Sequence, residues 1–210
     1  MLDPLPAFSQ AKHLPHLGLD VAYLVQPSFY YGPARMDQLR DFYDKAIDLP
    51  APAFVHNHRA LARAVEGQEE QLVGYYQEVL RLMQHYGKEL SACEHYFWLR
   101  PVLLSEGEPC FTFPWCDTYP ETAGVLRALQ DPRPDGILLH DREQGWEIVI
   151  YAQGNRIYLA ESGAEEDEPY QVGYTDRARL ADLAAAALRR TQQQLALFVR
   201  ATGQNPWRVY

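Results

Sequence analysis

The clearest alternation of hydrophobic and polar positions lies between residues 136 and 161 (GILLHDREQGWEIVIYAQGNRIYLAE). It predicts three strands, which we place at 137–140, 146–152 and 156–161. The segments from Asp141 to Gly145 and from Gln153 to Asn155 contain the glycine and asparagine that tight turns require. Short turns join antiparallel strands, so we expect an antiparallel meander here.

The strand at 146–152 is apolar on both of its faces. Trp146, Ile148 and Ile150 share one face, while Val149 and Tyr151 occupy the other. Such a strand is covered on both faces, or is covered on one face and lined with aromatic residues on the other.

The rest of the segment 95–174 also indicates short strands. Residues 95–104 are apolar and aromatic, Glu106 to Pro109 form a predicted turn, and residues 110–115 alternate. The alternation places Phe111, Phe113 and Trp115 on one strand face. A short helix is expected at about 120–130 and an edge strand at 170–174.

Helical periodicity dominates the chain before and after this meander. Apolar residues recur at helical spacing from 55 to 90 and from 176 to 202, and a shorter helix is predicted over 36–48. The 55–90 segment forms one long helix or two with a bend near Gly67. Asp176 is a suitable N-cap of the last helix, and Gly203 is a suitable stop.

The order of these elements predicts an α+β fold rather than a βαβ fold. We expect a central antiparallel sheet of four to six short strands packed with two long helices, in a single domain over 1–210. Its expected parts are an extended arm (1–19), a mainly helical part (20–94), the antiparallel meander (95–174) and the C-terminal helix (176–202). A strand at 21–25 would be an edge strand, because Pro27 follows it.

Composition and charge indicate where the protein resides and which classes of partner it can bind. The chain of 210 residues has a formal net charge of −9 at pH 7, which argues against nucleic-acid binding. No apolar stretch approaches the roughly 18 residues of a membrane helix, and the first residues do not resemble a signal peptide. The sequence therefore predicts a cytoplasmic protein; its oligomeric state stays open.

Few patterns in the sequence indicate a metal, a cofactor or catalysis. The chain has no phosphate loop, dinucleotide-binding glycines, nucleophile elbow or paired-histidine zinc helix. Cys93, His95, Cys110 and Cys116 carry ligand atoms that zinc prefers, but their spacing is unlike that of structural zinc sites, and three cysteines do not form a disulfide framework. We expect no metal and no cofactor.

An acid–base site is the enzymatic alternative. His140, Asp141, Glu143 and Asp117 could serve a small hydrolase or transferase, with His140 and Asp141 at a strand end. A turn rich in Asp and Glu is also what hairpin formation and solubility require. We therefore predict no catalytic residues.

Two interpretations are possible for the acidic run formed by Glu165, Glu166, Asp167 and Glu168. It is a solvated loop, or it presents a negative patch to a basic partner, together with Asp141 and Glu143 from a nearby turn. We choose these six acids as the partner-binding residues that the sequence predicts.

The segment DREQGW, continued by EIVIYAQGNRIYLAES, an acidic loop and a terminal amphipathic helix, resembles bacterial immunity proteins of contact-delivered toxin systems. The resemblance covers about residues 95–207. It implies a cytoplasmic protein that binds and blocks a cognate toxin and has no catalysis of its own. A non-catalytic adaptor protein is a further alternative.

Overall fold

The computed structural model describes the chain except residues 1–7, 33–43, 134, 144, 163–170 and 209–210. The chain divides into two compact units, which we treat separately. The first unit comprises residues 1–21, 100–116 and 121–189, and the second comprises residues 22–99, 117–120 and 190–210. The prediction of a single domain stays a prediction.

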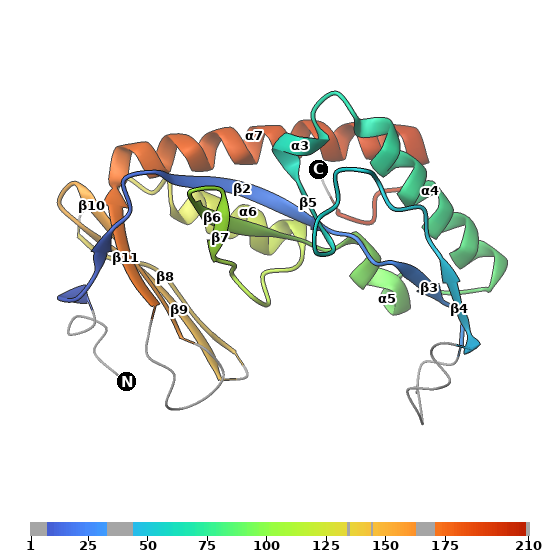
Figure 1. The fold of residues 1–210 in the computed structure, drawn as a ribbon, viewed down its shortest axis with the longest axis horizontal. Helices are drawn as coiled ribbons and strands as arrows, with labels where there is room; N and C mark the ends of the chain where they lie inside the picture. The colour runs from blue at the N-terminus through green and yellow to red at the C-terminus, as the bar shows by residue number, and fades with distance from the viewer. Residues whose placement is uncertain (1–7, 33–43, 134, 144, 163–170, 209–210) are drawn as a thin grey trace. The chain divides into compact units, whose positions relative to one another are not determined.

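The first unit contains a five-stranded sheet with the order β1-β11-β10-β9-β8. Figure 1 shows β8 to β11 side by side. The strands are β1 (Lys12–His13), β8 (Gly136–Glu143), β9 (Trp146–Gln153), β10 (Arg156–Ser162) and β11 (Gln171–Asp176). The strands from β8 to β11 pair antiparallel with their neighbours, as the meander predicts, but β1 pairs parallel to β11.

The turn between β8 and β9 is shorter than predicted. Glu143 pairs with Trp146, so Asp141 and Glu143 lie in β8 and not in a turn. Gly145, with a φ of 92°, supplies the left-handed conformation that lets so short a loop close the hairpin.

A second sheet has four strands in the order β5-β2-β6-β7. These strands are β2 (Leu17–Leu24), β5 (Arg59–Leu61), β6 (Leu99–Ser105) and β7 (Glu108–Phe111). The predicted edge position of the strand before Pro27 is wrong, because β2 has a neighbour on each side and ends before the proline. The first nineteen residues are not only an extended arm, since β1 and the start of β2 fall within them.

The predicted strand face of Phe111, Phe113 and Trp115 does not form. Strand β7 ends at Phe111, and Phe113 and Trp115 have positive φ angles of 45° and 74°. Pro114 lies between them and has no amide hydrogen to continue a ladder. Phe113 is buried, whereas Trp115 is 39% exposed.

Two predicted helices are confirmed, one within the segment 95–174 and one after it. Helix α6 spans Tyr119–Ala128, and α7 spans Arg177–Thr202. The Arg179 amide donates a hydrogen bond to the Asp176 carboxylate (2.8 Å), which makes Asp176 the N-cap. Gly203 follows the helix with a φ of 70°, as a helix stop requires.

The part of the chain predicted to be mainly helical, residues 20–94, contains more strands than expected. Strands β3 (Ser28–Tyr30) and β4 (Ala46–Asp48) pair antiparallel as a two-stranded sheet. The helix predicted over 36–48 therefore fails at its end, because 46–48 forms β4; its residues 36–43 lie outside the described part.

The long helical segment predicted over 55–90 forms only in part, because Arg59–Leu61 is β5 and α4 ends at His85; the rest is divided at the predicted bend. It contains α3 (Ala62–Val65), α4 (Glu69–His85) and the start of α5 (Leu90–Cys93), after which a 3₁₀ turn η1 spans Glu94–Phe97. Gly67, with a φ of 79°, separates α3 from α4. The described residues thus form a mixed α and β fold with antiparallel sheets, but they hold five α-helices rather than two and more than one sheet.

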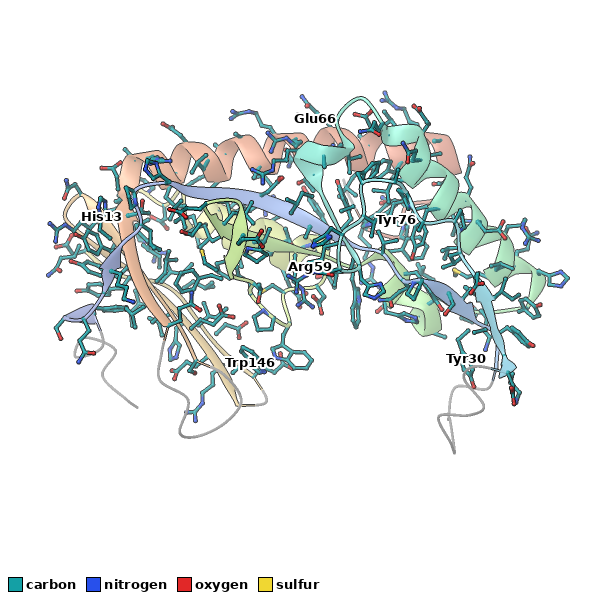
Figure 2. The ribbon with its side chains drawn as sticks, viewed as in Figure 1. His13, Tyr30, Arg59, Glu66, Tyr76 and Trp146 are labelled. Atoms are coloured by element: carbon teal, nitrogen blue, oxygen red, sulfur yellow. The ribbon has the colours of Figure 1, made fainter. Side chains whose placement is uncertain are left out.

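Aromatic rings form the core of the second unit. Tyr76, labelled in Figure 2, contacts Phe97, Phe198 and Trp207, with ring centroids between 4.8 and 5.6 Å away. All four side chains are at most 4% exposed. Their burial makes this cluster a structural core rather than a surface.

Candidate binding face

One row of side chains crosses all five strands of the first unit's sheet. The register pairs Ile137 of β8 with Tyr151 of β9, Tyr151 with Tyr158 of β10, Tyr158 with Tyr174 of β11, and Tyr174 with His13 of β1. Directly paired residues project from the same face of a sheet. We call these five residues the aromatic row; Figure 2 labels His13 at its β1 end.

Neighbouring rings in the row contact one another. The rings of Tyr158 and Tyr174 are 5.6 Å apart, and the His13 imidazole stacks on Tyr174 at 5.0 Å. The Arg156 guanidinium lies 4.8 Å from the centre of the Tyr174 ring, which is cation–π distance. The rings of His13, Tyr174 and Tyr158 therefore form a continuous surface, with a cation at its side.

Phe8 packs on the row from the N-terminal segment. Its ring lies 5.7 Å from the ring of Tyr151 and 5.3 Å from that of Tyr158. Phe8, Ser9, Tyr151, Gln153 and Tyr158 line a hollow of about 280 Å³ on this face. Only part of the row is thus covered by the described residues.

The two faces of the sheet differ in exposure. Tyr151, Tyr158 and Tyr174 are half-buried, and Ile137 is 49% exposed. On the opposite face Ile150, Ile157 and Leu159 are at most 1% exposed. The row's face is itself partly covered, because Val149 and Ala160 project from it, are at most 2% exposed and form a small hydrophobic cluster with Phe8. The half-buried rings beside this cluster are the part of the face that is offered for binding.

The sequence-predicted partner-binding residues are only partly described. Glu165, Glu166, Asp167 and Glu168 lie outside the described residues, so their proposed role stays a prediction. Asp141 and Glu143 occupy successive same-face positions of β8, with Asp141 half-buried and Glu143 exposed.

His140 and Asp141 do not form a pair with each other. They are adjacent on β8 and project from opposite faces of the sheet. The His140 Nε2 atom lies 2.7 Å from Oε1 of Glu147, whereas Asp141 accepts a long contact from the Cys116 thiol, 3.9 Å away.

The Ser162 hydroxyl, on the same face of the sheet as His140, is also poorly placed for nucleophilic catalysis. Ser162 of β10 pairs with Glu147 of β9, and His140 lies on β8, on the other side of Glu147. A nucleophile needs the imidazole within hydrogen-bond reach, and here the carboxylate occupies that position.

The thiols and the imidazole that were considered for zinc lie in environments that favour their neutral forms. Burial raises the pKa of the Cys93 and Cys110 thiols and lowers the pKa of His95. Cys93 lies in α5 and His95 in the following 3₁₀ turn. Within the described ranges, no three His, Cys, Asp or Glu side chains are grouped to hold a metal ion.

The sequence contained a signal for part of the aromatic row. A two-residue loop of Gly154 and Asn155 pairs Gln153 with Arg156, and counting back along the strands then pairs Tyr151 with Tyr158. The sequence contained no such indication for His13 and Phe8. Strand β1 pairs with β11, which lies far away in the sequence, so no short loop predicts the pairing.

Comparisons with known proteins give no further guide. No protein-family model, curated protein or solved structure matches this chain. In the described part of the chain, no helix is both long enough and apolar enough to cross a membrane.

Proposed function

We propose that this chain is a binding protein that holds a protein partner on the aromatic row. One observation carries the proposal: three tyrosine rings lie in register on one face of the five-stranded sheet and stay half-exposed, because the described residues cover that face only in part. Tyrosine supplies a large contact area and a hydroxyl at a small cost in conformational entropy, and it is enriched among interface hot spots.

Charge supports a basic partner. The chain has a net charge of −9, and its four consecutive acids, 165–168, lie in sequence between the strands that carry Tyr158 and Tyr174. Acidic groups attract a basic protein over a distance and raise its association rate, while buried aromatic contacts supply the affinity.

The class of partner follows from the resemblance to immunity proteins. The partner is then a cognate bacterial toxin with a basic surface, which the chain neutralises by occupying its active groove in the cytoplasm. The chain needs no catalysis of its own for this role. An adaptor protein would use the same face for a partner that is not a toxin.

Co-expression tests this function. We expect a toxin gene next to the gene for this chain, and we expect co-production of the chain to restore growth to cells that make the toxin. Replacing Tyr151 and Tyr158 with alanine should weaken toxin binding by about tenfold or more, measured by calorimetry, and should abolish the rescue.

A matched control is available in the second unit. Tyr31 and Tyr86 form a stacked surface pair, with ring centroids 4.6 Å apart and Tyr86 36% exposed. Their replacement with alanine should leave toxin binding and rescue unchanged. An isolated gene, or equal losses for the two double variants, would contradict the proposal.

The acidic run has its own test. Replacing Glu165, Glu166, Asp167 and Glu168 with serine should slow association with the toxin and flatten its dependence on salt, because long-range attraction is lost. Stopped-flow measurements at low ionic strength give the rate. An unchanged rate would show that these acids do not take part in binding.

A further inference from the structure

Strand β8 is the longest edge strand in the described part of the chain. It ends the order β1-β11-β10-β9-β8, so β9 is its only neighbour there, and its eight residues include no proline. The other edges are shorter: β1 has two residues, β3, β4 and β5 have three each, and β7 has four and contains Pro109. Short strands and prolines blunt an edge, because an unpaired edge is a template for another strand.

The hairpin between β8 and β9 determines which backbone groups of β8 point outward. Glu143 pairs with Trp146, labelled in Figure 2, across a two-residue loop, and such a closing pair is hydrogen-bonded. Hydrogen-bonded and non-hydrogen-bonded pairs alternate, so Asp141 also bonds to β9, whereas the backbone groups of His140 and Arg142 point away from it. Within the described residues, these outward N–H and C=O groups have no hydrogen-bond partner.

The open part of this edge is short and regular. The register shifts after Ile137, and a bulge of this kind interrupts pairing. Beyond it, residues 140–143 continue without interruption, and His140, Arg142 and Glu143 are exposed. Two outward residues offer two donors and two acceptors, so an added strand can form up to about four hydrogen bonds with β8.

The side chains of the same residues differ in charge between the two faces. His140 and Arg142 project from the face of the aromatic row, on which Ile137 is the outermost residue, and Asp141 and Glu143 project from the opposite face. A strand with basic residues at alternate positions places them opposite the two acids, where opposite charges stabilise a cross-strand pair. Its intervening residues lie beside Arg142, whose guanidinium favours an aromatic ring.

A second copy of the chain is a poor occupant of this edge. If His140 pairs with Arg142 of the copy, Asp141 lies opposite the same residue of the copy, and if Arg142 pairs with itself, two guanidinium groups meet. If His140 pairs with itself, Arg142 meets the bulge after Ile137. Like charges directly opposite destabilise a sheet and a bulge interrupts its ladder, so these registers disfavour antiparallel self-association.

We propose that the outer edge of β8 pairs with an extended, basic segment of the protein partner, in which lysine or arginine alternates with apolar or aromatic residues. The inference rests on the proposed function for the identity of that partner, whereas the pairing itself depends only on the edge. The segment becomes an additional strand of the sheet. Its basic side chains pair with Asp141 and Glu143, and its other side chains extend the face that carries the aromatic row.

A synthetic peptide tests the pairing without the toxin. The fluorescein-labelled peptide acetyl-TKYKYKT-amide, in which lysine and tyrosine alternate, is titrated with the full chain, and anisotropy measures saturable binding. N-methylation of both tyrosines removes the donors that face β8 and should weaken binding at least about tenfold. N-methylation of two lysines, whose N–H groups face away, should change it by less than about twofold. Equal losses for the two methylated peptides, or no saturable binding, would overturn the proposal.

Two substitutions at one position test the strand of this chain. Arg142→Pro removes an outward N–H and keeps the bonds between β8 and β9, whereas Arg142→Ala removes the same side chain and keeps the N–H. The proline variant should bind the peptide at least about fivefold more weakly than the alanine variant, and equal affinities would overturn the proposal. Thermal melting checks folding. The methylated peptides act on the unchanged chain, so they decide the question if the proline variant does not fold.

A charge comparison tests the choice of a basic segment. The double variant Asp141→Asn, Glu143→Gln should bind the peptide at least about fivefold more weakly than the unchanged chain. The control Glu70→Gln, Glu89→Gln removes two exposed acids of the second unit and should leave the affinity unchanged. Equal losses for the two double variants would mean that only the net charge attracts the peptide, and would overturn the proposal.

The outcomes separate this inference from the proposed function. Peptide pairing that persists in the Tyr151 and Tyr158 double variant supports the edge even if that variant still binds the toxin and the role of the row fails. Toxin binding that is lost in the tyrosine variant but equal in Arg142→Pro and Arg142→Ala would keep the row and overturn the edge. A dimer of the chain alone in ultracentrifugation, abolished by Arg142→Pro, would show that a second copy occupies the edge and would also overturn the proposal.

Discussion

The two units use tyrosine in opposite ways. In the second unit Tyr23, Tyr75 and Tyr76 are fully buried, and Tyr76 lies among the rings of Phe97, Phe198 and Trp207. In the first unit Tyr158 and Tyr174 lie on a sheet face that the described residues cover only in part, and both stay half-exposed. The residue type therefore does not show whether a tyrosine belongs to the core or to the surface. That depends on whether other parts of the chain pack over its ring.

The hydroxyl groups of the buried tyrosines show a second difference. The Tyr23 hydroxyl donates to the side chain of Gln194 (2.9 Å), and Gln194 in turn donates to the Ala62 carbonyl (2.7 Å). The Tyr76 hydroxyl is buried and makes no hydrogen bond within the described chain. Tyr76 thus contributes to the core through its ring, and Tyr23 through both its ring and its hydroxyl.

The largest expected effect tests the contrast between core and surface. Phe198→Ala in the second unit should lower the free energy of unfolding by about 3–5 kcal/mol, because it leaves a cavity among packed rings. Tyr158→Ala on the aromatic row should cost less, about 2 kcal/mol or below, since this half-buried ring loses its contacts with Phe8 and Tyr174 and leaves no enclosed cavity. Urea denaturation measures both, and a similar loss for the two variants would remove the distinction.

A smaller effect should separate the two buried hydroxyls. Tyr23→Phe removes the donor to the buried side-chain oxygen of Gln194 and should destabilise the protein by about 1–3 kcal/mol. Tyr76→Phe removes a hydroxyl that has no partner, so the stability should be unchanged or should rise by about 1 kcal/mol. A destabilising Tyr76→Phe variant would mean that this hydroxyl is satisfied in solution.

The smallest expected effect is a change of stability with pH, and the two units should show it in different pH ranges. In the first unit, burial raises the pKa of Glu161 above 4.5, and hydrogen bonds from Thr112 only partly oppose this. The folded state then holds the proton more tightly than the unfolded state, so stability falls as pH rises from about 4.5 through the raised pKa. Glu161→Gln should remove this dependence.

In the second unit the same argument applies at alkaline pH. Burial raises the pKa of Tyr75 and Tyr76 well above 10, so the unfolded chain releases these protons first and stability falls as pH rises above 10. Peptide-resolved hydrogen exchange should show that α4, which contains Tyr75 and Tyr76, loses protection above pH 10. Strand β10, which contains Glu161, should instead lose protection between acid and neutral pH. Loss in the reverse order would contradict the assignment.

Short-range features could be predicted well from the sequence. The Gly154–Asn155 loop sets the register of β9 and β10, Gly67 separates α3 from α4, and Asp176 and Gly203 delimit α7. Each of these depends on backbone conformation or on hydrogen bonds within a few residues, so local sequence is sufficient.

The candidate site was predicted less well, and its acidic residues show why. Asp141 and Glu143 were expected in a turn, but the loop that follows them closes in fewer residues and draws both into β8. His140 and Asp141 were considered together because they are adjacent in sequence, yet adjacency in a strand sends two side chains to opposite faces.

By itself the sequence determined the β9–β10 hairpin, the break at Gly67 and the two ends of α7, because short loops and caps act on neighbouring residues. Only the tertiary structure decided that His13 completes the row beside Tyr174, that Phe8 covers Tyr151 and Tyr158, and that segments 94–98 and 117–120 meet the chain's end around Trp207. Those contacts join residues far apart in the chain, and they form because burial of ring surface outweighs the entropy of closing long loops. Periodicity can show that a ring is on one face of a strand, but only the packed chain shows whether another element covers that face.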